Sequence, residues 1–89
     1  MKVLKFGAVW CSGCLVMRPK WEEIEKEIPN LITEYYDFDK DKETVDMFNI
    51  DSKLPVCVFL DKDNKEILRF TGEAEKGQLL RAISENINK

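Results

Sequence analysis

Two cysteines separated by two residues are the side chains in this sequence best suited to chemistry. Cys11 and Cys14 flank Ser12 and Gly13, and Trp10 comes directly before them. The thiolate is the form of cysteine that attacks disulfides, and two thiols at this spacing can form and break a disulfide with each other. An apolar run precedes the pair and a helix-like pattern follows it. We therefore expect the pair at a strand-to-helix corner.

The position of the pair relative to the helix predicts different roles for the two sulfurs. A helix N-terminus presents unpaired N–H groups and partial positive charge, which stabilise an anion. Cys11, at the helix start, is predicted to be the attacking thiolate, whereas Cys14 is predicted to be more buried and less ionised. Side chains three residues apart share a helix face, so Cys14 can attack a mixed disulfide on Cys11 and release the reduced product. This exchange needs no cofactor.

The composition limits the other kinds of site that the chain could carry. There are three cysteines and no histidine, so one chain cannot supply a Cys–His nucleophile or a mixed Cys/His zinc site. A four-thiolate zinc site would need a second pair, and only Cys57 is left. Cys57 lies in an apolar run and is predicted to be an inert core thiol. Two alternatives for the pair remain open: a pair of buried core cysteines, or half of a metal or cluster site shared across a dimer.

Length and charge describe a small, mildly acidic domain. The chain has 89 residues, of which 35% are charged, with a formal net charge of −3. This length predicts one domain, residues 1–89. The basic residues are scattered rather than clustered, and no apolar run approaches the roughly 18 residues of a membrane span. The N-terminus is too short and too charged for a signal peptide. We therefore expect a cytoplasmic monomer that binds neither nucleic acid nor membrane.

Seven elements must position the cysteine pair. Alternating apolar runs, turn residues and helical periodicity predict strands over 2–6, 31–38, 56–60 and 66–71, and helices over 15–28, 42–49 and 75–87. The order β-α-β-α-β-β-α predicts an α/β fold, in which the first βαβ unit forms a parallel pair with a right-handed crossover. The expected result is a four-stranded mixed sheet with helices on both faces.

Apolar residues three and four apart define the predicted buried faces of the two longer helices. Those of the first helix are Leu15, Met17, Trp21, Ile24 and Ile28, and those of the last are Leu79, Leu80, Ile83 and Ile87. Pro19 lies inside the first pattern, where a proline removes one backbone hydrogen bond and is predicted to kink the helix.

Four features, in order along the chain, resemble the thioredoxin-like superfamily. They are WCSGC at residues 10–14, Pro19 eight residues after the first cysteine, Pro55 at the start of an apolar strand, and Gly72 followed by the KGQL segment at 76–79. The resemblance covers nearly the whole chain and implies the compact thioredoxin fold, in a glutaredoxin-sized outline. It also implies that Pro55 is a cis-proline beside the cysteines.

The same resemblance implies a function and a set of partners. The implied activity is thiol–disulfide exchange that reduces protein disulfides, with Trp10, Leu54 and Pro55 contacting the substrate. The implied partners are disulfide-containing proteins and an electron donor, either a thioredoxin-reductase-like flavoenzyme or glutathione. The alternative is a non-enzymatic interaction module that docks partners on the surface between Trp10 and Pro55.

The chain also departs from ordinary thioredoxins. Ser12 and Gly13 lie between the cysteines and are predicted to tune the redox potential. Lys5 stands where typical thioredoxins carry an acidic proton acceptor, and Tyr35 stands where they carry a charged residue. If Lys5 pointed under the pair, its charge would lower the pKa of Cys14. The favoured alternative keeps its ammonium in water on an apolar stem. In either case Cys14 must lose its proton to water or to another carboxylate.

Overall fold

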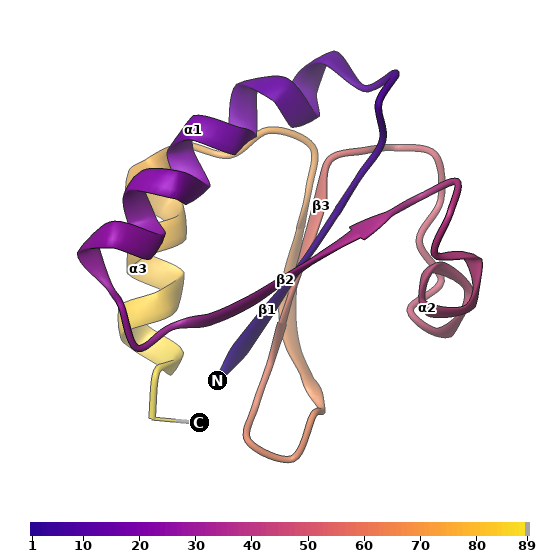
Figure 1. Ribbon diagram of the computed structural model, residues 1–89. Helices are drawn as coiled ribbons and strands as arrows, with labels where there is room; N and C mark the ends of the chain where they lie inside the picture. The colour runs from indigo at the N-terminus through magenta and orange to yellow at the C-terminus, as the bar shows by residue number, and fades with distance from the viewer. Residues whose placement is uncertain (89) are drawn as a thin grey trace.

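The structure is a computed structural model that describes residues 1–88, and Figure 1 shows its α/β arrangement. The elements, in chain order, are β1 (Lys2–Gly7), α1 (Ser12–Glu27), β2 (Ile32–Asp37), α2 (Lys42–Met47), β3 (Val56–Leu60), β4 (Glu66–Thr71) and α3 (Lys76–Asn86). Their order and type confirm the sequence prediction. The first helix starts earlier than the predicted range because Cys11 caps it.

The four strands form one mixed sheet in the order β2-β1-β3-β4. Strand β1 pairs in parallel with β2 and antiparallel with β3, and β4 pairs antiparallel with β3. The two interior strands are β1 and β3, and every residue of β3 is buried. A strand covered on both faces is apolar at every position rather than at alternate ones, which explains the sequence of β3.

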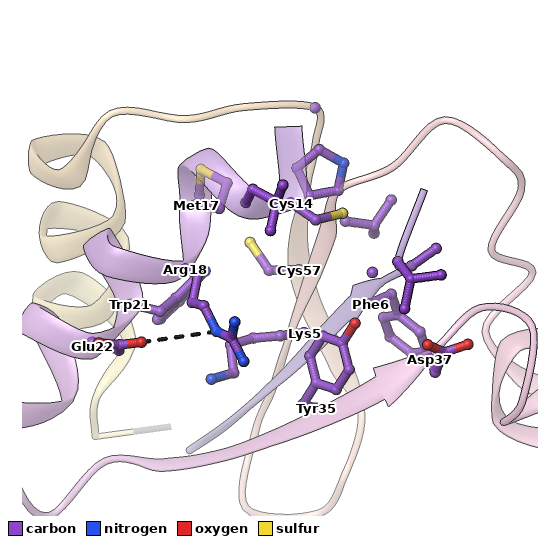
Figure 2. A pocket seen from close by; sticks show the side chains of 17 residues that line it. Lys5, Phe6, Cys14, Met17, Arg18, Trp21, Glu22, Tyr35, Asp37 and Cys57 are labelled. Atoms are coloured by element: carbon purple, nitrogen blue, oxygen red, sulfur yellow. Dashed lines mark ion pairs between the residues drawn. The ribbon is translucent and has the colours of Figure 1, made fainter. Parts of the chain in front are cut away.

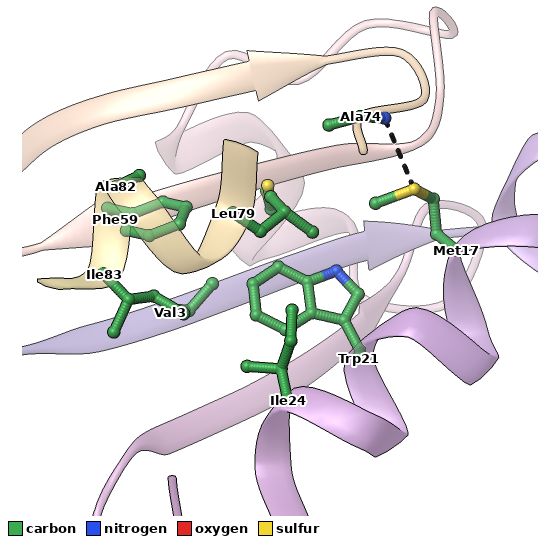
Figure 3. Packing of buried hydrophobic residues seen from close by; sticks show 10 residues of the cluster. Val3, Met17, Trp21, Ile24, Phe59, Ala74, Leu79, Ala82 and Ile83 are labelled. Carbon is green, nitrogen blue, oxygen red and sulfur yellow. Dashed lines mark hydrogen bonds between the residues drawn. The ribbon is translucent and has the colours of Figure 1, made fainter. Parts of the chain in front are cut away.

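Helices α1 and α3 cover one face of the sheet and α2 covers the other (Figure 1). On the first face, Trp21 and Ile24 of α1 pack with Leu79 and Ile83 of α3 over Phe59 of β3 (Figure 3). The rings of Trp21 and Phe59 are 6.4 Å apart between centroids.

On the second face of the sheet, Leu4 and Phe6 of β1 pack with Val45 of α2. Successive strand residues point to opposite faces, so Val3 belongs to one cluster and Leu4 to the other. The predicted α/β fold with helices on both faces is therefore confirmed.

Two residues of the predicted helical faces are exposed, and the predictions for them are wrong. The exposed fraction is 64% for Leu15 and 42% for Ile87. Leu15 precedes the buried Met17 by two residues, and helix residues two apart do not share a face. Ile87 is the C-cap of α3 and lies beyond its last buried turn.

Pro19 lies within α1, as the sequence predicted. Among residues 1–88, no helix combines the length and the apolar composition needed to cross a membrane.

Candidate active site

The two cysteines meet at the N-terminus of α1. Cys11 is the N-cap residue in an extended conformation (φ −94°, ψ 108°), and Cys14 lies in the first turn. The backbone N–H of Cys14 donates a hydrogen bond to Sγ of Cys11, with an N···S distance of 3.2 Å. Both thiols are free. A sulfur thus takes the capping position that a side-chain oxygen usually takes, and the N–H group favours negative charge on that sulfur.

The exposure of the two cysteines is the reverse of the predicted order. Cys11 is buried, with an exposed fraction of 6%, whereas Cys14 is only partly buried. The N–H of Cys11 bonds to the carbonyl oxygen of Ala8 at 3.2 Å, which turns the loop back over the helix start. Cys14 nevertheless resists ionisation. Desolvation, followed by the hydrogen bond with Cys11, raises the pKa of the Cys14 thiol to about 12.

Pro55 lies against the cysteine loop. The Leu54–Pro55 peptide bond is cis, as the resemblance implied. A Cβ atom on Gly13 would lie 3.0 Å from Cδ of Pro55, so glycine at this position permits close approach of the loop to the proline ring. The carbonyl oxygen of Pro55 accepts a hydrogen bond from the N–H of Gly72 at 2.7 Å, where φ is +90°. Leu54 packs against the cluster on the α2 face.

Trp10 and Ser12 are the exposed members of the cysteine loop. The Trp10 side chain has an exposed fraction of 54%. Its Nε1 donates to Oδ2 of Asp39 at 2.7 Å, and its ring meets Phe38 edge-on at 6.0 Å between centroids. Trp10 is therefore held in place by polar and aromatic contacts without being part of the core. Ser12 is the first residue of α1 and is exposed.

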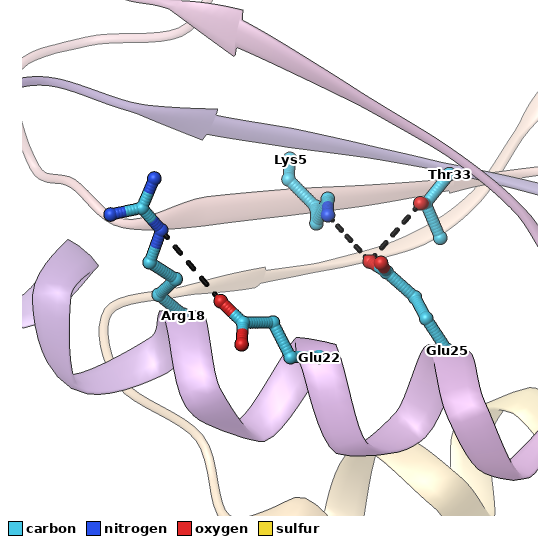
Figure 4. A network of polar contacts seen from close by, with 5 residues as sticks. All are labelled: Lys5, Arg18, Glu22, Glu25 and Thr33. Atoms are coloured by element: carbon cyan, nitrogen blue, oxygen red, sulfur yellow. Dashed lines mark hydrogen bonds and ion pairs between the residues drawn. The ribbon is translucent and has the colours of Figure 1, made fainter.

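The ammonium of Lys5 lies neither under the cysteine pair nor free in water, the two positions expected from the sequence. It pairs with a carboxylate of α1. Its Nζ lies 2.6 Å from Oε2 of Glu25, and the same oxygen accepts from Oγ1 of Thr33 at 3.1 Å (Figure 4). The ammonium also lies 5.8 Å from the centre of the Trp21 ring. The prediction of an ammonium in water is therefore wrong, because Glu25, twenty residues away in sequence, lies directly above β1.

A cavity of about 550 Å³ opens beside Cys14, between α1 and the strands β1 and β2 (Figure 2). Lys5 and Gly7 of β1 lie in register with Tyr35 and Asp37 of β2, and all four residues line this cavity. From the sequence, Tyr35 is only a departure from typical thioredoxins, and neither Gly7 nor Asp37 is predicted as a site residue. Strand periodicity was the available signal, since residues two apart share a face.

Gly7 leaves open a space that both the Tyr35 hydroxyl and the Cys14 sulfur border. A Cβ atom on Gly7 would lie 2.9 Å from the hydroxyl oxygen and 3.2 Å from Sγ. The two groups therefore share the space that a larger residue would fill. Cys57 lines the cavity from β3 and is buried. In the part of the chain that the structure describes, no three Cys, Asp or Glu side chains are grouped to hold a metal ion.

Comparison with known proteins agrees with this geometry. The thioredoxin family model matches residues 1–85. The chain belongs to the thioredoxin family. Thioredoxin of Chlamydia trachomatis is 29% identical over 94% of this chain and 80% of its own length. Thioredoxin of Geodia cydonium is 31% identical over 94% of this chain and 77% of its own length.

Solved structures of thioredoxins have the same fold. The chain superposes on Fasciola hepatica thioredoxin with a TM-score of 0.85 at 34% identity, covering 96% of this chain and 79% of that one. Thioredoxin-2 of a malaria parasite gives a TM-score of 0.86 at 24% identity, covering 94% and 81%. Family membership supports thiol–disulfide oxidoreductase activity in general, with disulfide-containing proteins and reductases as the family's general partners.

Proposed function

We propose that this protein reduces protein disulfides through the Cys11–Cys14 dithiol. The observation that carries the proposal is the hydrogen bond from the Cys14 N–H to Cys11 Sγ at the start of α1. It stabilises a thiolate at Cys11 and places the second thiol one turn away. The cis Pro55 beside Gly13 completes a loop against which an extended substrate segment can lie.

The reaction proceeds in two exchange steps. The Cys11 thiolate attacks one sulfur of the substrate disulfide, which forms a mixed disulfide and releases the other substrate sulfur as a thiolate that takes up a proton. Cys14 then loses its proton and attacks Cys11 Sγ, which breaks the mixed disulfide and releases the second substrate thiol. The substrate disulfide gains two electrons and the protein dithiol loses two. An external reductant returns the Cys11–Cys14 disulfide to the dithiol.

The surface around the pair supports an assignment of substrate contacts. Trp10 offers a half-exposed ring next to Cys11, and Pro55, which follows Leu54 in the loop before β3, lies against Gly13 between the cysteines. These three residues are the proposed substrate contacts. Ser12 and Gly13 lie between the cysteines and are proposed to set the redox potential. The proposed electron donor is a thioredoxin-reductase-like enzyme or glutathione, and the proposed setting is the cytoplasm.

Insulin reduction tests the activity. With dithiothreitol as the reductant, the wild-type protein is expected to accelerate precipitation of the insulin B chain. Cys11→Ser is expected to lose this acceleration because the attacking sulfur is gone. Cys57→Ser is the matched control, because the thiol that it removes does not lie at the helix cap. Acceleration that persists in Cys11→Ser would rule out the proposed mechanism.

The exposed apolar side chains near the cysteines support a second candidate function. Val9, Trp10, Leu15 and Val16 have exposed fractions of 85%, 54%, 64% and 45%. An apolar surface of this kind can also serve a binding module without redox chemistry. A variant with both Cys11 and Cys14 changed to serine decides between the two candidates: it retains the cellular role of a binding module and loses that of a reductase.

A further inference from the structure

The step that the proposed function leaves open is the removal of the proton from Cys14. Partial burial and the hydrogen bond with Cys11 raise the pKa of this thiol to about 12. In the mixed disulfide the contribution of the Cys11 thiol is lost, but desolvation, the largest cause, still raises the pKa of Cys14, so the thiol stays mostly protonated at neutral pH and attacks slowly. Lys5 offers no acceptor for the proton, because its ammonium carries only donors and is paired with Glu25 at 2.6 Å. Another group must take the proton as the attack proceeds.

The hydroxyl of Tyr35 is the polar group placed beside the Cys14 sulfur. A Cβ atom on Gly7 would lie 2.9 Å from the Tyr35 hydroxyl oxygen and 3.2 Å from Sγ of Cys14. Figure 2 shows the tyrosine ring rising from β2 with its hydroxyl directed toward the side of the cavity that holds Cys14. Desolvation, with the charges of Asp37 and Cys14, raises the pKa of Tyr35. The hydroxyl therefore stays protonated at neutral pH and can donate its own proton while accepting another.

Asp37 provides a carboxylate on the same face of β2. It lies two residues after Tyr35 and lines the same cavity. Its Oδ1 accepts hydrogen bonds from the N–H groups of Asp39 at 2.9 Å and Lys40 at 3.1 Å, which hold the carboxylate at the end of the strand.

The other charged groups that line this cavity have partners of their own. From β1, Lys5 pairs with Glu25; from α1, Arg18 lies 3.9 Å from Glu22. The remaining titratable groups are the thiols of Cys14 and Cys57. Glu22 is the other carboxylate that lines the cavity, but of the two only Asp37 is among the charges that raise the pKa of Tyr35, so Asp37 is the acceptor for a proton that arrives through Tyr35.

We propose that Tyr35 relays the proton of Cys14 to the carboxylate of Asp37 when Cys14 resolves the mixed disulfide. This inference rests on the proposed function. The S–H bond of Cys14 breaks, and its proton goes to the Tyr35 oxygen as the tyrosine proton passes to Asp37, directly or through one water molecule. The electron pair left on Cys14 forms the bond to Cys11 Sγ, and the substrate sulfur leaves as a thiolate. Asp37 then returns the proton to solvent.

Stopped-flow reaction of the reduced protein with 5,5′-dithiobis(2-nitrobenzoate) separates the two exchange steps. The first release of thionitrobenzoate reports attack by Cys11, and the second reports resolution by Cys14. Tyr35→Phe is expected to leave the first phase unchanged and to slow the second at least about tenfold, because one proton-transferring group is lost. Its second phase is also expected to rise in proportion to hydroxide concentration, because solvent must now take the proton.

Tyr36→Phe is the matched control. Its hydroxyl bonds to Glu34 at 2.7 Å, and its ring stacks on Phe6 toward the opposite face of the sheet. This variant is expected to retain both wild-type phases. Asp37→Asn keeps the acceptor oxygen for the turn and is expected to show the same pH dependence as Tyr35→Phe.

Each outcome of this experiment decides a different claim. A second phase in Tyr35→Phe that matches the wild type in rate and pH profile would overturn the relay. A wild-type pH profile in Asp37→Asn would overturn the carboxylate as the proton acceptor. If the wild-type protein shows no first phase, the proposed function itself fails, whatever Tyr35 does.

Discussion

At the residue scale, the site depends on a sulfur that caps a helix. Cys11 Sγ accepts the N–H of Cys14 at 3.2 Å. A hydrogen bond to a charged acceptor is stronger than one to a neutral acceptor, so the cap stabilises the thiolate more than the thiol. Desolvation, and after it a hydrogen bond between the two thiol side chains, raises the pKa of Cys14. The two sulfurs therefore have different surroundings, as the proposed division between an attacking and a resolving sulfur requires.

Cys57 is the third sulfur, and its surroundings predict low reactivity. Burial raises the pKa of its thiol to about 12. Two thiols are expected to react with a thiol reagent in the native protein, and the third only after unfolding in guanidinium chloride. Counting released thionitrobenzoate in each state checks this. Three fast-reacting thiols in the native state would contradict an inert core position for Cys57.

The raised pKa of Cys57 makes the free energy of unfolding depend on pH. The folded-state pKa of Cys57 is raised above its ordinary value of 9.0, so its contribution to stability is full below pH 9.0 and is lost as the pH rises toward 12. The loss has a limiting slope of about 1.4 kcal/mol per pH unit. Cys57→Ala is expected to flatten this alkaline slope in urea titrations, and an unchanged slope would contradict the assignment.

Residue positions were predictable from the sequence where they depended on the course of one element. The cysteine spacing placed Cys11 at the helix cap and Cys14 in the first turn. Tertiary contacts were not predictable in this way. Lys5 pairs with Glu25 only because α1 packs over β1, and the burial of Cys11 depends on a loop that turns back to Ala8.

At the element scale, α1 carries the cysteines and is anchored by its middle turns. Trp21 has an exposed fraction of 5% and packs on Phe59 of β3. Lys76 at the start of α3 pairs with Glu23 at 3.2 Å and with Glu27, which adds polar contacts between the two helices. Ion pairs with exposed partners contribute little, so the apolar contacts hold the helix in place.

Trp21→Ala tests that anchor. Removing a buried indole is expected to lower the free energy of unfolding by about 3–5 kcal/mol, from lost burial and the cavity left behind. Leu15→Ala is the matched control on the same helix, with a side chain that is 64% exposed, and should change stability by less than about 0.5 kcal/mol. Urea titration of both variants measures the difference. Equal losses would contradict the described packing of α1.

Element type was predictable because local signals agreed with one another. The ranges predicted for β3 and β4 match the observed Val56–Leu60 and Glu66–Thr71. The error came in the first turn of α1, where Leu15 fits a loose apolar pattern. The buried face is defined instead by Met17, Trp21 and Ile24, and only the packed structure shows which of two overlapping stripes contacts the sheet.

At the scale of the whole molecule, the fold followed from element order. A βαβ unit and a later hairpin leave few arrangements of a four-stranded sheet, and the handedness of the crossover limits them further. The cavity beside Cys14 did not follow, because it combines side chains from α1, β1 and β2 whose register had to be known first. The family match over residues 1–85 agrees with the fold.

The most direct test of the account is mass spectrometry of single-cysteine variants after reaction with a disulfide-containing protein. Cys14→Ser lacks the resolving sulfur, so it is expected to accumulate a covalent mixed disulfide through Cys11. Cys11→Ser is expected to form far less at neutral pH, because desolvation, the largest cause of the raised pKa of Cys14, remains in this variant. Peptide mapping should place the adduct on Cys11. An adduct that forms on Cys14 in Cys11→Ser as fast as on Cys11 in Cys14→Ser would contradict the division of roles between the two sulfurs.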